Sequence, residues 1–223
     1  MDFPKAIYWL LTVFIGLLSL PVDAQINLKT GYTISFMSDE GMNQVIHLFD
    51  LPDHTTPFKD LSWIHGFEAG FRFKTDVHGF ELGYLGGYQK LEARGTRMPD
   101  LLDFTDKIKV GVHGAEVGYQ VSGKIFGLGA ELHHHWYRTR ADIAGRSPAF
   151  EHTQTMLAYS IYSLITVAGE NGIDLAIKPY IVIPDKPYDH DPLQRYNGSE
   201  ILISKREKWI RYGISILFYN GEN

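Results

Sequence analysis

Apolar and polar residues alternate along eight segments of the chain, as expected for strands that carry one apolar face. In the second segment, Trp63, Phe67 and Phe71 lie on one face, whereas Glu68 and Arg72 lie on the other. The segments are residues 26–36, 62–74, 78–91, 107–121, 125–138, 155–167, 173–183 and 201–219. The pattern therefore predicts an all-β chain of eight strands.

The connections between these segments alternate in length. Residues 75–77, 122–124 and 168–172 form short turns, whereas residues 37–61, 92–106, 141–154 and 184–200 form long loops. Beyond residue 24 the long loops hold every proline except Pro179. Because proline cannot donate a ladder hydrogen bond, Pro179 predicts a bulge or a weak point in the seventh strand. An even strand number with short turns at one end and long loops at the other is typical of an eight-stranded antiparallel up-and-down transmembrane β-barrel.

Residues 1–24 have the layout of an export signal. Lys5 precedes a stretch without charge, residues 6–20, and small residues follow it up to Ala24. This stretch is shorter than the roughly 20 residues that a membrane-spanning helix needs, so a cleaved signal is favoured over an uncleaved anchor. We therefore expect cleavage after Ala24, one barrel domain over residues 25–223, and a location in the cell outer membrane.

A short motif with glycine, an aromatic or apolar residue and glutamate recurs at residues 66–71, 79–84 and 114–119. Period two puts the glycines and glutamates of each copy on one face. An eight-stranded barrel is narrow, so we expect this face to line the lumen and the apolar face to meet lipid. The predicted lumen charge network is Glu68, Arg72, Glu81, Glu116, Glu131, Asp174, Lys178 and Arg211. Pairing of these charges would seal the lumen, although a proton or ion path stays open as an alternative.

Aromatic residues near the strand ends predict the two membrane interfaces. The predicted girdle consists of Trp63, Trp136 and Trp209 at the long-loop end and Tyr119, Phe218 and Tyr219 at the other end. Two details fit poorly. Trp209 has the lumen parity of its strand, and residues 108, 110 and 112 alternate out of phase with residues 115, 117 and 119. A bulge near His113 and Gly114 would reconcile the fourth segment.

Composition excludes several kinds of chemistry. The chain has no cysteine, so it has neither disulfides nor thiolate metal sites, and its net charge of −5 argues against nucleic-acid binding. Glu131, His133 and His135 share one strand face and are weak candidates for a metal site. Along one strand they are too widely spaced to chelate an ion without another strand, so a hydrogen-bonded cluster is favoured. No cofactor is predicted.

The mature chain resembles the small outer-membrane β-barrels of the OmpX/OmpA type and the PorT-like barrels. The resemblance rests on the cleavage context at Ala24, the glycine-glutamate repeats, and the closing pattern Tyr212-x-Ile214-x-Ile216-x-Phe218. That pattern is similar to the signal read by barrel-assembly machinery, except that five further residues follow it. The resemblance implies outer-membrane lipid and this machinery as partners, and only weakly a role in secretion.

The favoured function is a structural or interaction role, in which the long loops bind an envelope protein or glycan, with an accessory role in a larger envelope or secretion assembly left open. Two alternatives remain. One is a barrel enzyme that modifies envelope lipid, although the His-x-Ser pattern of lipid A deacylases is absent from the sequence. The other is a soluble exported barrel that binds a small ligand, which requires the opposite assignment of the two strand faces.

Overall fold

A computed structural model describes residues 25–37, 39–97, 100–167, 173–198 and 206–220. Eight antiparallel strands form a closed barrel, which confirms the predicted fold class. They are β1 Gln25–Met37, β3 Trp63–Lys74, β4 His78–Arg97, β5 Leu102–Ser122, β6 Phe126–Asp142, β7 Phe150–Val167, β8 Ile173–Pro184 and β9 Arg211–Asn220. Pairing of β1 with β9 joins the two ends of the sheet. The predicted signal, residues 1–24, and the turn at 168–172 lie outside the described residues.

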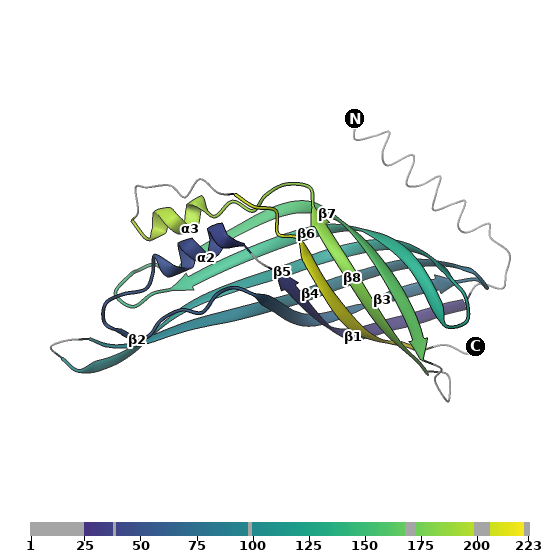
Figure 1. Cartoon of the computed structure of the whole chain (residues 1–223), viewed down its shortest axis with the longest axis horizontal. Coiled ribbons are helices and arrows are strands. Elements are labelled where there is room, and N and C mark those ends of the chain that lie inside the picture. Colours follow the sequence, from purple (N-terminus) through teal and green to yellow (C-terminus); the bar gives the residue numbers. More distant parts are fainter. Residues whose placement is uncertain (1–24, 38, 98–99, 168–172, 199–205, 221–223) are drawn as a thin grey trace.

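Four strands are longer than the sequence pattern predicts. Strands β4 to β7 continue past the barrel at the end where the two helices lie (Figure 1). As a result, the predicted loop 92–106 shrinks to the connection between Arg97 and Leu102, and the predicted loop 141–154 shrinks to residues 143–149. In the eighth predicted segment, residues 206–210 form no strand and β9 begins at Arg211, whereas residues 201–205 lie outside the described residues. Long connections therefore remain only after β1 and after β8.

These two connections contain the remaining elements. Helix α2, Glu40–His47, and the short strand β2, His54–Thr56, follow β1, and helix α3, Asp191–Tyr196, follows β8. Asp39 caps α2 by accepting a hydrogen bond from the Met42 amide at 2.9 Å. Strand β2 pairs with the far end of β4. In the described part of the chain, neither helix is long and apolar enough to cross a membrane.

The fourth predicted segment is one regular strand without a bulge. Strand β5 keeps an unbroken register with both β4 and β6. Ile108, Val110 and Val112 point inward, as do Gly114 and Glu116 farther along. The predicted bulge near His113 is therefore wrong. The backbone keeps its phase, and it is the character of the interior that changes from apolar to charged.

That change divides the molecule into two zones. One zone has a charged interior and an apolar outer face. The other, which we call the head, has an apolar interior that includes Met42, Phe49, Val110, Tyr137 and Trp209. The head consists of residues 88–97, 102–112, 137–142 and 150–156 of the long strands together with residues 39–62, 143–149, 185–198 and 206–210. It is a small folded core built onto one wall of the barrel (Figure 1).

Pro179 interrupts the pairing of β7 with β8. The ladder runs through Tyr162 and Tyr180, stops, and resumes at Ile165 and Ile177 in the same register. The site is a weak point of the kind expected for proline, without a bulge.

Candidate functional site

The outer face of the barrel zone is apolar on all eight strands. Phe71 is 52% exposed, whereas Glu68, three residues away on the same strand, is 1% exposed. Exposed large apolar side chains follow one another around the ring, among them Leu28 on β1, Leu82 on β4, Val117 on β5, Leu132 on β6, Ile161 on β7, Ile181 on β8 and Ile214 on β9. A soluble monomer rarely exposes so large an apolar surface. The inverted faces required by a soluble ligand-binding barrel are therefore excluded.

Two lysines hold the carboxylates of the lumen. Lys29 Nζ on β1 lies 2.7 Å from a carboxylate oxygen of each of Glu68, Glu81 and Glu116. Lys178 Nζ on β8 lies 2.7 Å from Glu68 and 2.6 Å from Glu131. All of these side chains are buried. Each carboxylate thus has a charged partner, which offsets much of the cost of removing it from water.

Lys29 is the centre of this network, and the sequence interpretation missed it. It is 0% exposed and bridges three strands, β3, β4 and β5. A signal was available, because Lys29 alternates with the outward-facing Leu28 on its strand. What the sequence did not offer was the stagger of the strands, which brings three distant glutamates to one ammonium group.

The two lumen arginines do not take the role expected of them. Arg72 donates to the Asn27 side-chain oxygen at 3.3 and 3.2 Å and stacks 3.6 Å from the centre of the Tyr219 ring. Arg211 contacts the His135 ring, with 3.5 Å between Nη2 and Nδ1. Neither makes an ion pair with a carboxylate in the described part of the chain, so the prediction that they neutralise the glutamates is wrong. The predicted network residue Asp174 is buried on β8.

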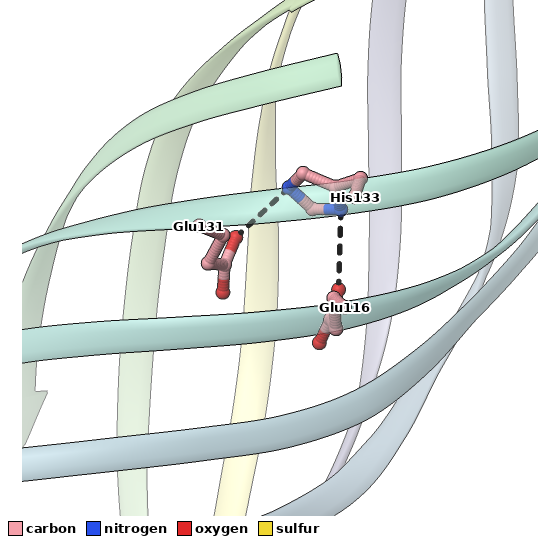
Figure 2. Close-up of side chains that lie close together, drawn as sticks. All are labelled: Glu116, Glu131 and His133. Carbon is pink, nitrogen blue, oxygen red and sulfur yellow. Dashed lines mark ion pairs between the residues drawn. The ribbon is translucent and has the colours of Figure 1, made fainter. Parts of the chain in front are cut away.

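His133 lies between two of the glutamates (Figure 2). Its Nε2 is 3.3 Å from Glu131 and 2.9 Å from the Ser160 hydroxyl, and its Nδ1 is 3.7 Å from Glu116. Imidazole and carboxylate groups this close together could hold a divalent metal ion. The set differs from the predicted one, because Glu116 takes the place of His135. Both carboxylates already bind a lysine, so an ion would have to compete with ammonium groups.

The same residues resemble a nucleophile and its base, because the Ser160 hydroxyl faces His133. The hydroxyl, however, donates to Glu131 at 2.8 Å. The adjoining lumen cavity has a volume of about 10 Å³, which is room for about one water molecule. Because no substrate could fit beside Ser160, the geometry supports a structural cluster rather than a catalytic one.

A closed ring of eight strands with a charged interior and an apolar belt decides the architecture. This is the fold of the small outer-membrane β-barrels. No family model and no curated protein matches the chain. Among solved structures it is similar to Ail of Yersinia pestis in complex with the heparin analogue sucrose octasulfate (12% identity, 90% of this chain and 99% of that one, TM-score 0.46).

Two further solved structures show a somewhat weaker likeness. Neisserial surface protein A has 12% identity, with 88% and 97% of the two chains covered and a TM-score of 0.43. The outer membrane protease OmpT of Escherichia coli has 10% identity, 88% and 93% coverage and a TM-score of 0.36. Such likeness concerns the fold and says nothing about activity or ligands. The closed sheet of eight strands agrees with the expected resemblance to OmpX-type barrels, whereas the narrower resemblance to PorT-like barrels stays a prediction.

Most of the predicted girdle lies on the outer face of the barrel. Trp63, Tyr119 and Phe218 are exposed, and Trp136 is half-buried. Tyr219 is different, because it is 1% exposed and points into the lumen, where its hydroxyl donates to Glu81 at 3.3 Å. The assignment of Tyr219 to the girdle is therefore wrong. It directly follows an outward-facing residue, and successive strand residues face opposite sides.

Trp209 is also not a girdle residue. It is 0% exposed and lies in the head, where its indole stacks on Tyr188 with ring centres 4.1 Å apart. The indole N–H donates to the Asp39 carboxylate that caps α2. Burial raises the pKa of that carboxyl. Trp209 therefore ties the segment before β9 to the start of α2.

Proposed function

We propose that this protein lies in the outer membrane and acts as an interaction protein, presenting its head outside the cell. The observation that carries the proposal is the reversal of polarity along single strands. On β5, Val117 faces outward and Glu116 inward, whereas farther along Lys107 and Lys109 face outward and Ile108 inward. An apolar exterior suits lipid and a charged exterior suits water, so the reversal supports a head that stands clear of the membrane.

The packing of the head favours a role in binding a partner over a role as a passive connection between strands. Its core joins side chains from α2, α3 and the extended strands, instead of leaving long loops with few contacts. A preorganised surface loses less conformational freedom when a partner binds, and so retains more of its interaction energy. An envelope protein or a glycan is the class of partner that such a surface would serve.

The lumen supports a role without transport or catalysis. Five ion pairs between lysine and glutamate fill it, and its cavity has a volume of about 10 Å³. In this proposal, the chain is exported, cleaved after Ala24 and then inserted by the barrel-assembly machinery.

The lack of cysteine makes the orientation easy to test. Variants with a single cysteine at position 107, 108 or 117 would be treated, on intact cells, with a membrane-impermeant maleimide. We expect labelling at Lys107→Cys only, since residue 108 lies in the head core and residue 117 faces lipid. Labelling at 107 only after the envelope is broken would reverse the orientation and refute the proposal.

The interaction role needs a second readout. A photo-crosslinking residue in place of Leu51, which is exposed on the head, would report contacts made on living cells. The matched control is the same residue in place of Lys124, in the short turn between β5 and β6. A protein or glycan adduct of defined size from position 51 but not from 124 is the expected result. Lipid adducts alone at position 51 would count against a partner for the head.

A further inference from the structure

The outer face of β4, β5 and β6 has a hollow where the head meets the barrel zone. Its volume is about 170 Å³. It is lined by Tyr88, Lys109, Gly111, His113, Arg138 and Arg140. Three of these six residues are cations and none is an acid, so the hollow is suited to an anion.

The hollow is built from two neighbouring rows of outward-facing residues, each row being a set of cross-strand partners on β4, β5 and β6. In the row nearer the barrel zone, called the lower row, Gly111 lies between Tyr88 and Arg138. Because Gly111 has no side chain, this row leaves an open floor between an aromatic ring and a guanidinium group. Lys109 Nζ lies 4.1 Å from the centre of the Tyr88 ring, so the lysine is held over the hollow.

The upper row places three cations directly opposite one another. Lys109 pairs across the ladder with Lys90 on one side and with Arg140 on the other. Like charges in opposite positions destabilise a sheet. Lys90 has Glu92 as an ion-pair partner, but Lys109 and Arg140 have no ion pair in the described part of the chain. An anion bound between these two would remove the repulsion.

The height of the hollow indicates where the anion comes from. The next outward row toward the barrel zone holds His113 and Trp136, and His113 Nδ1 is 2.7 Å from the Tyr84 hydroxyl. Amphipathic rings of this kind mark the headgroup level of a membrane. The hollow thus opens sideways, just above that level, where the headgroups of neighbouring lipids lie.

We propose that this hollow binds a phosphate group on the headgroup of an outer-leaflet lipid. Arg138 and Arg140 can each grip phosphate oxygens through two N–H groups, and Lys109 supplies a point charge. Glu151 lies directly opposite Arg140 in the ladder, but its carboxylate pairs with Arg138 at 2.7 Å. Lys109 and Arg140 are therefore the lining cations without an ion pair in the described part of the chain. The inference rests on the proposed orientation in the membrane.

The test compares lipids that differ only in their phosphates. The full mature protein, in neutral detergent micelles, is titrated with fluorescent lipid A and with the same lipid after removal of its phosphates. The site variant is Lys109→Gln with Arg140→Gln. The control variant is Arg94→Gln with Lys107→Gln, which removes the same charge from the same outer face but outside the hollow.

We expect the site variant to bind lipid A about tenfold or more weakly than the wild type, and the control to stay within about twofold, since a change of tenfold corresponds to about 1.4 kcal/mol. The dephosphorylated lipid should bind the wild type as weakly as lipid A binds the site variant. Equal losses in both variants would mean that net charge alone attracts the lipid, and would overturn the site.

A second arm separates a lipid from a soluble polyanion. Heparin is titrated against the wild type and the site variant in the same micelles. Tighter binding of heparin than of lipid A, lost in the site variant, would assign the hollow to soluble glycans and overturn the lipid proposal. Boiled and unboiled gel mobility reports the folded barrel, and cell-surface labelling at position 107 reports its orientation. Failure of lipid binding therefore leaves both results intact.

Discussion

Replacing Lys29 by methionine tests whether the lumen network holds the barrel together. Lys29 Nζ contacts three buried carboxylates at 2.7 Å each, and a methionine side chain fills the space without the charge. Two of the three carboxylates keep another partner. Glu68 retains Lys178 at 2.7 Å, and Glu81 retains the Tyr219 hydroxyl at 3.3 Å. Glu116 loses its only lysine.

These contacts set the expected size of the effect. Removing one partner of a buried ion pair costs about 3–5 kcal/mol, because the other charge is left without compensation. Glu68 keeps a lysine and Glu81 keeps a hydroxyl donor, whereas Glu116 keeps only the His133 ring at 3.7 Å. We therefore expect a loss in this range and not three times as much. The free energy of unfolding would be measured in phosphatidylcholine vesicles, from urea titrations followed by tryptophan fluorescence and by gel mobility.

Two further variants make the result interpretable. Lys107→Met removes an exposed lysine from the outer face of β5, and should change the free energy of unfolding by less than about 0.5 kcal/mol. Adding Glu116→Gln to Lys29→Met removes the uncompensated charge, and should recover about 1 kcal/mol or more. A loss below about 1 kcal/mol for Lys29→Met, or no recovery in the double variant, would refute the view that the network is a stabilising plug.

Three other predictions concern the head and the barrel wall. Asp39→Ala removes the cap of α2 and the acceptor of a buried indole, and should destabilise the head by about 1–2 kcal/mol, seen as faster amide exchange in residues 40–47 while the barrel strands stay protected. Hydrogen bonds to Asp50 and Asp60 raise the pKa of His47. The contribution of His47 to the stability of the head is therefore complete below its unfolded pKa, and is lost as pH rises through its folded pKa. The protection factors of the α2 amides, which are corrected for the intrinsic rise of exchange with pH, should therefore fall as pH rises through the folded pKa. His47→Gln should abolish that fall. Gly66→Ala would put a methyl carbon 1.8 Å from a carbonyl oxygen of β4 and should prevent heat-modifiable barrel formation, whereas Gly123→Ala, with 3.7 Å to its nearest neighbour, should be tolerated.

The repeating pattern of the chain determined the barrel itself. Alternation along a strand is local information, and it fixed which residues face outward and which face the lumen wherever one face is shielded. The position of Glu68 inside and Phe71 outside could therefore be read from the sequence. The same rule places Tyr219 inside, and it would also have placed Lys29 there.

Only the tertiary structure decided how far the strands run and what lies inside them. Beyond the girdle, the inward residues Ile108 and Val110 become apolar, and this makes sense only once α2 and α3 cover them. The same holds for Trp209, whose burial depends on Tyr188 and Asp39 from distant segments.

The contacts of Lys29 and the like-charged row at Lys109 likewise join residues that are far apart in the chain. Their distances depend on the stagger between neighbouring strands, which is a property of the closed sheet and not of any one strand. The sequence by itself therefore determined the faces of the barrel, and the closure of the sheet determined which charges meet.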